Sequence, residues 1–108
     1  MTDQLEFLYK IKPTRPEMLI VGPTDHEAEL VSQHFNYLQT LLDKGILILA
    51  GRTQNTDESS FGRVIFRAVS KMVSQKIMHR YPAVKQGVMK AELFHYKVAL
   101  IKKRGSER

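Results

Sequence analysis

The segment from Thr24 to Gly45 constrains the fold of this 108-residue chain more than any other. Thr24, followed three residues later by Glu27, forms a capping box, which is typical of the start of a helix. Apolar side chains then recur at helical spacing, and Gly45 suits the left-handed residue that follows a last helical turn. The apolar stripe consists of Val31, Phe35, Leu38 and Leu42, with His34 and Leu41 beside it. These signals predict one helix of about 20 residues, roughly 30 Å long.

Four other segments have the patterns of strands. Residues 5–11 alternate apolar and polar side chains, and Pro13 and Pro16 end that strand. Residues 46–50 are apolar at every position, so both faces of that strand should be covered. Residues 61–69 follow a polar, turn-rich connection and should pair with 46–50 as an antiparallel hairpin. Residues 88–101 predict a long last strand, whose expected packing residues are Leu93, Phe94, Tyr96, Val98 and Leu100.

A second helix between the last two strands completes the order of elements. Ser70 can cap it, Val73 and Ile77 share one face, and Pro82 prevents it from running far beyond Tyr81. The order strand, helix, strand, strand, helix, strand predicts an α+β fold of ferredoxin-like βαββαβ type. In that fold, a four-stranded antiparallel sheet carries two helices on one face and leaves the other open. An open face conflicts with the apolar residues 46–50, so we expect a homodimer packed sheet to sheet.

Composition and charge narrow the class of protein. The length suits a single domain over residues 1–108, with a basic, disordered tail at 101–108. The N-terminus lacks a signal-peptide pattern and the apolar runs are too short to cross a bilayer, so a cytoplasmic protein without membrane contact is expected.

Charge is distributed unevenly along the chain. Residues 1–60 carry 5 basic and 9 acidic side chains, whereas residues 61–108 carry 12 basic and 2 acidic ones. Nucleic-acid binding by the basic half is not expected, because neither a basic helical stripe nor an aromatic stacking platform is present.

His34 is the leading candidate for chemistry. Its position, three residues after Val31 and four before Leu38, places it on the side of the helix that faces the sheet. An imidazole there could act as a general base near neutral pH, because its ordinary pKa is about 6.5. The alternative is a structural histidine whose nitrogens are satisfied by a backbone carbonyl or by water.

Several polar residues at strand ends could bind a substrate. Arg15 and Arg52 could clamp an anionic ligand, although arginines are more often simply surface residues. Asp57, Glu58 and Ser60 offer carboxylates and a hydroxyl beside the strand at 46–50, or form an ordinary polar loop.

No motif in the chain indicates a metal or a cofactor. The sequence lacks cysteine, and its four histidines show neither an i,i+4 pair nor a clustered carboxylate, so we expect no metal site. The sequence also lacks a dinucleotide-binding fingerprint, a P-loop and a hydrolase elbow. We therefore expect no nucleotide cofactor, and neither P-loop nucleotide chemistry nor hydrolase-elbow chemistry.

Several short segments, taken together, resemble the YciI-like (YCII-related) family. The similarity runs from about Phe7 to Leu100 and is carried by residues 34–38, 45–53, 55–62, 82–89 and 91–94. The resemblance implies a dimeric α/β barrel of two ferredoxin-like chains, with a pocket centred on His34. It also implies a likeness to a few relatives that eliminate halide from, or otherwise transform, small ring compounds, with a histidine–aspartate pair as the proposed machinery.

The chain departs from the family pattern at the aspartate, whose position before Pro82 is taken by Tyr81. A tyrosine has a pKa near 10 and offers a hydrogen bond but no negative charge at neutral pH. Two hypotheses therefore stay open. The chain is either a divergent acid–base enzyme, lyase-like or dehalogenase-like, acting on a small anionic compound, or a non-catalytic dimer that binds a metabolite or supports a partner.

Overall fold

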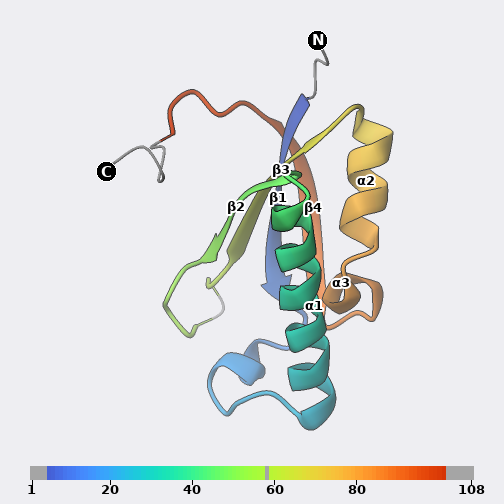
Figure 1. The fold of residues 1–108 in the computed structure, drawn as a ribbon. Helices are drawn as coiled ribbons and strands as arrows, with labels where there is room; N and C mark the ends of the chain where they lie inside the picture. Colours follow the sequence, from blue (N-terminus) through green and yellow to red (C-terminus); the bar gives the residue numbers. More distant parts are fainter. Residues whose placement is uncertain (1–4, 58, 102–108) are drawn as a thin grey trace, which may run out of the picture.

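The computed structural model describes residues 5–57 and 59–101 and consists of a four-stranded antiparallel sheet with helices on one face (Figure 1). The predicted order of elements is confirmed, with a 3-10 helix and a short third helix in addition. The elements are β1 (Leu5–Pro13), η1 (Pro16–Leu19), α1 (Asp25–Asp43), β2 (Leu47–Arg52), β3 (Gly62–Ala68), α2 (Lys71–His79), α3 (Pro82–Lys85) and β4 (Met89–Tyr96). The strands lie in the order β2-β3-β1-β4, so the fold is ferredoxin-like, as predicted.

The longest helix, α1, begins and ends where the sequence predicts. The backbone N–H of Glu27 donates to the Thr24 hydroxyl (3.1 Å), and the Thr24 N–H donates to the Glu27 carboxylate (2.9 Å), which completes the capping box. Gly45 adopts a φ of +76°, the left-handed conformation that glycine accepts without strain. Among the described residues, no helix combines the length and the apolar composition that a membrane span requires.

The buried face of α1 is rotated from the predicted stripe. Its buried residues are Leu30, His34 and Leu41, whereas Phe35 is 64% exposed and Leu42 is also exposed. The prediction of a stripe through Phe35 and Leu42 was therefore wrong. The helix is apolar over a wider arc than it buries, so spacing alone does not locate the centre of the buried face.

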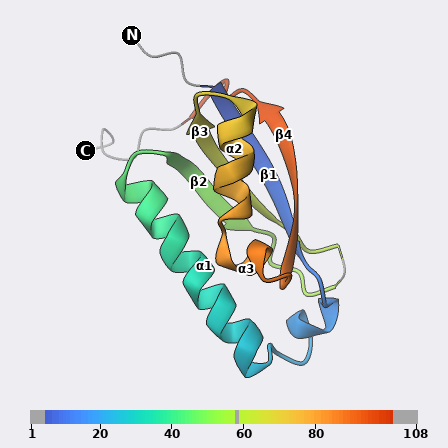
Figure 2. The same cartoon turned by 90° about the vertical axis from the view of Figure 1, so that its right-hand side faces the viewer.

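The core lies between the two longer helices and the sheet (Figure 2). Alternate residues of β1 and β3 point into it, as the period of two predicts. The buried members of this core are Phe7, Tyr9, Ile11, Leu41, Leu47, Val64, Phe66, Ala68, Met78 and Tyr81. The Tyr37 hydroxyl of α1 donates to the Ile77 carbonyl of α2 (3.3 Å), so the two helices are also joined directly.

One strand prediction needs correction, and another stays a prediction. Residues 46–50 were expected to be covered on both faces, on the open face by a second copy; in the single chain, β2 is an edge strand and Leu49 is 48% exposed. The last strand was expected to reach residue 101, yet β4 ends at Tyr96, and Leu100 is 94% exposed. Tyr96 pairs with Glu6, and within the described residues no strand pairs with those that follow Tyr96. Phe94 and Tyr96, predicted as packing residues, are exposed in the single chain.

Candidate functional site

His34 points from the buried face of α1 toward the sheet and is only 5% exposed. It lines a pocket of about 330 Å³, hereafter the His34 pocket. The walls of this pocket are mostly apolar and include Ile11, Val31, Phe35, Leu38, Val64 and Met89. Neither ring nitrogen of His34 has a hydrogen-bond partner within the described part of the chain. Buried polar atoms in folded proteins are nearly always paired, so two buried nitrogens without a partner are unusual.

The charge state of His34 follows from its burial. Desolvation lowers the pKa of the imidazole from 6.5 to about 4, because the charged form loses its hydration. At pH 7 the ring is therefore neutral, with one nitrogen that donates and one that accepts a hydrogen bond.

Tyr81 lies against the imidazole on the core side. The His34 and Tyr81 rings have centroids 4.9 Å apart, and Tyr81 is completely buried. Its hydroxyl has no partner within the described residues, and burial raises the pKa of that phenol. Tyr81 therefore brings no negative charge to His34.

A second buried phenol, Tyr9, lies beside Tyr81, with ring centroids 4.5 Å apart. The Tyr9 hydroxyl also lacks a partner within the described chain. Sequence analysis missed Tyr9 as a polar neighbour of this site, because the alternating pattern of residues 5–11 indicates only that the Tyr9 side chain packs in the core.

The structure separates the two arginines that were predicted to bind a substrate. Arg52, at the end of β2, lines the His34 pocket. Arg15 does not line that pocket, because it forms a bidentate pair with Glu27, whose oxygens lie 2.9 and 2.6 Å from Nε and Nη2. The guanidinium, together with hydrogen bonds from Thr24, lowers the pKa of Glu27 to about 2. Arg15 thus fastens the connection before α1 to the first turn of that helix.

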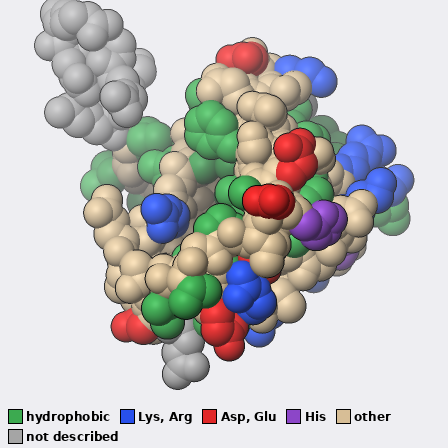
Figure 3. Space-filling view, turned by 90° about the horizontal axis from the view of Figure 1, so that it is seen from below, with side chains coloured by type: hydrophobic (Ala, Val, Ile, Leu, Met, Phe, Trp, Pro, Cys, Tyr) green, Lys and Arg blue, Asp and Glu red, His purple; other side chains and the backbone are tan. Residues whose placement is uncertain are grey.

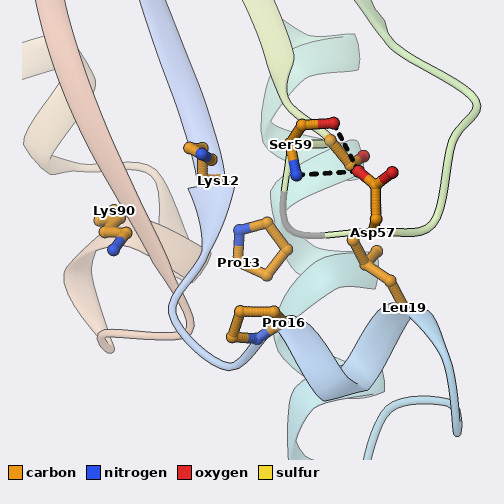
Figure 4. A pocket seen from close by; sticks show the side chains of 8 residues that line it. Lys12, Pro13, Pro16, Leu19, Asp57, Ser59 and Lys90 are labelled. Carbon is orange, nitrogen blue, oxygen red and sulfur yellow. Dashed lines mark hydrogen bonds between the residues drawn. The ribbon is translucent and has the colours of Figure 1, made fainter.

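The predicted polar loop belongs to a different pocket. Asp57 and Ser60 line a pocket of about 400 Å³ at the end of the sheet, hereafter the lysine pocket, together with Lys12 and Lys90 (Figure 4). The Asp57 carboxylate accepts hydrogen bonds from the Asn55 amide and from the backbone and hydroxyl of Ser59, which lower its pKa. Glu58, also predicted to bind substrate, lies outside the described residues.

The two lysines were not singled out by sequence analysis. Their side chains lie together only because Lys12 of β1 and Lys90 of β4 are register partners, which a sequence does not specify. This end of the molecule, seen from below in Figure 3, shows basic, acidic and apolar side chains intermixed. Among the described residues, no group of three or more His, Cys, Asp or Glu side chains could hold a metal ion.

Fold and pocket together define a ferredoxin-like α+β protein with a small-molecule-sized pocket between a helix and the sheet. The chain belongs to the YCII-related domain family, which matches residues 7–96. No curated protein matches the sequence.

The solved structures that match this chain include the following three. The 5-chloro-2-hydroxyhydroquinone dehydrochlorinase (TftG) from Burkholderia phenoliruptrix AC1100, in complex with 2,5-dihydroxybenzoquinone, is 23% identical, with a TM-score of 0.63 over 86% of this chain and 94% of that one. SnoaB, a cofactor-independent oxygenase from Streptomyces nogalater, is 8% identical, with a TM-score of 0.49 over 93% and 97% of the two chains. A dimeric ferredoxin-like protein from an uncultured marine organism is 15% identical, with a TM-score of 0.47 over 94% and 100%.

Proposed function

We propose that this protein binds a small, largely apolar compound in the His34 pocket. The observation that carries the proposal is that His34, whose two buried ring nitrogens have no partner among the described residues, lines a mostly apolar pocket of about 330 Å³. A buried polar group left unpaired costs about 1–3 kcal/mol, and a ligand oxygen that hydrogen-bonds to it offsets this cost. The pocket also falls within the usual size range of small-molecule sites.

The charge on Arg52 supports a ligand that carries a negative group. Arg52 lines the His34 pocket, and its guanidinium has no carboxylate within salt-bridge distance in the part of the chain that the structure describes. A planar guanidinium can donate two parallel hydrogen bonds to an anionic oxygen group, so a small anionic compound could bind next to Arg52 in this pocket.

Binding is favoured over catalysis in this form of the site. An effective general base has a pKa near the working pH, whereas burial holds the pKa of His34 at about 4. Tyr81 stands where relatives place an aspartate, so no charge raises the basicity of the imidazole. Acid–base chemistry on the bound compound is the second candidate, supported by the neutral, base-competent form of the ring.

A ligand screen with a matched pair of variants tests the proposal. We expect 2,5-dihydroxybenzoquinone or a related ring compound to raise the Tm, since a ligand at 100 times its Kd stabilises the folded state by about 2.7 kcal/mol. His34→Gln should keep the fold and weaken binding at least tenfold, as expected for the loss of about 1.4 kcal/mol of hydrogen bonding. His26→Gln, the same change at an exposed position of α1, is the control. Undiminished binding by His34→Gln would contradict the proposal, and turnover of a bound compound would favour the second candidate.

We further propose that the protein is a homodimer joined through the face of the sheet opposite the helices. Four apolar side chains form one continuous row across all four strands on that face. Register pairs join them in the order Leu49, Ile65, Leu8 and Phe94. The two outer members are 48% and 46% exposed, and a second copy laid sheet to sheet would cover them.

Sedimentation at micromolar concentration should therefore give the mass of a dimer. Phe94→Glu should shift the protein to monomer, because each copy would place a carboxylate in the apolar contact. Val21→Glu changes an exposed apolar residue away from the sheet and should leave the dimer intact. A wild-type monomer, or an unaffected Phe94→Glu dimer, would contradict this arrangement.

A further inference from the structure

A shallow groove of about 540 Å³, hereafter the basic groove, lies on the outer surface of α2 and α3. These two helices follow one another on the face of the sheet that the helices cover (Figure 2). The groove is therefore separate from the open face of the sheet, to which the dimer contact is assigned. All of its lining residues are exposed, namely Met72, Gln75, Lys76, His79, Arg80 and Lys85.

The charged side chains of the basic groove are cationic. The Arg80 backbone N–H donates to the Lys76 carbonyl (3.2 Å), so helical spacing extends to Arg80 and places both cations on one face. Like charges at this spacing destabilise a helix. Lys85 adds a third positive charge from α3, and the His79 imidazole adds an N–H donor.

No acidic residue of the surrounding segment balances these charges. The sequence contains neither Asp nor Glu between Ser59 and Ala91. Within residues 5–57 and 59–101, none of the three cations of the groove forms a salt bridge. Three positive charges therefore meet in one groove at a cost to the stability of α2, which a bound anion would offset.

The helix dipoles explain only part of this arrangement. Lys76 and His79 lie in the last turn of α2, and Lys85 lies in the last turn of α3, where a positive charge is favourable. That effect acts within the end of each helix separately. It does not require the cations of two helices to line the same groove.

The dimensions and the lining of the groove indicate the class of anion. The nine residues of α2 span roughly 13 Å, which is short for contacts along the backbone of an extended nucleic acid. None of the lining residues is aromatic, whereas unpaired bases bind by stacking on aromatic rings. A guanidinium binds a phosphate through two parallel hydrogen bonds, and a lysine binds it as a point charge. A compact anion with several charges therefore fits the groove.

We infer that the basic groove binds an anion with two adjacent phosphate groups, either free diphosphate or the diphosphate end of a small organic molecule. Lys76, Arg80 and Lys85 bind the phosphate oxygens, and His79 donates its imidazole N–H to them. The inference goes beyond the proposed function and does not depend on it, because the basic groove and the His34 pocket share no lining residue.

NMR titration with inorganic diphosphate tests the inference at about 0.15 M salt, where screening weakens non-specific attraction. We expect the amide signals of residues 76–85 to shift. Diphosphate should bind about fivefold tighter than monophosphate, which is the upper contribution of one additional exposed ion pair. Lys76→Gln/Arg80→Gln should weaken diphosphate binding about tenfold and leave the fold at least as stable, because it also removes a like-charge pair. Lys44→Gln/Lys97→Gln removes two exposed positive charges elsewhere and should preserve binding.

The same titration with other anions separates the alternatives. Tighter binding of methyl diphosphate would identify an organic ligand that contacts Met72, and equal binding would identify free diphosphate; both results support the inference. Equal affinity for monophosphate and diphosphate would overturn it. An equal loss of affinity in the two double variants would also overturn it, because net charge alone would then explain binding. Tighter binding of an oligonucleotide at residues 76–85 would replace the compact anion with a nucleic acid.

Discussion

Acidification from pH 7 to pH 4 is expected to lower the free energy of unfolding by about 3 kcal/mol through His34 alone. The pKa of this imidazole is about 4 in the folded protein and 6.5 in the unfolded chain. Between these values the unfolded state binds more protons, so stability falls as the pH falls. Each unit of pKa difference corresponds to about 1.4 kcal/mol, which gives the expected size. His34→Leu should remove this loss, because it replaces the imidazole with an apolar side chain that does not titrate.

Urea unfolding of both proteins at pH 7 and pH 4 measures this effect. The two proteins are compared at each pH, because Glu27, whose pKa of 4.5 is lowered to about 2 in the folded protein, adds the same acid sensitivity to both once the pH falls below about 4.5. His26→Gln is the control, since it removes an exposed imidazole from the same helix and should leave the acid loss of the wild type. Equal acid sensitivity in wild type and His34→Leu would mean that the folded protein protonates His34 readily, and that the ring is not desolvated.

The fold was predictable because its signals are local. The capping box of Thr24 and Glu27, the glycine after α1 and the alternation in β1 each specify one element within a few residues. What failed depends on neighbours distant in sequence. Which residues of α1 are buried depends on the elements that pack against the helix, and the end of β4 at Tyr96 depends on its pairing with β1.

The candidate site was predictable only in part, for a similar reason. Helical spacing placed His34 toward the sheet, and the family resemblance pointed to Tyr81, whose ring does lie against the imidazole. Sequence spacing did not indicate which arginine lies at the pocket. Arg52 lines the His34 pocket, whereas Arg15 donates hydrogen bonds to the Glu27 carboxylate. The role of each of these side chains stays a prediction, because it depends on a ligand.

Tyr81→Asp is expected to raise the pKa of His34 and to destabilise the protein by several kcal/mol. The ring of Tyr81 lies 4.9 Å from that of His34, centroid to centroid, and an opposite charge within about 4–6 Å favours the imidazolium. The same change empties a fully buried aromatic position, and replacing a large core residue by a small one costs about 3–5 kcal/mol. Pairing of the new carboxylate with the charged imidazole offsets part of this cost.

NMR titration of the His34 ring, with urea unfolding beside it, separates these two effects. Tyr81→Phe is the matched control, because it keeps the buried ring and removes a hydroxyl that has no partner among the described residues. That variant should be as stable as the wild type or more stable by about 1 kcal/mol, and its His34 pKa should stay near 4. An unchanged His34 pKa in a folded Tyr81→Asp protein would show that the carboxylate turns away from the imidazole, and that position 81 does not substitute for the aspartate of the family. A raised pKa without turnover of any bound compound would keep the geometry and favour binding over catalysis.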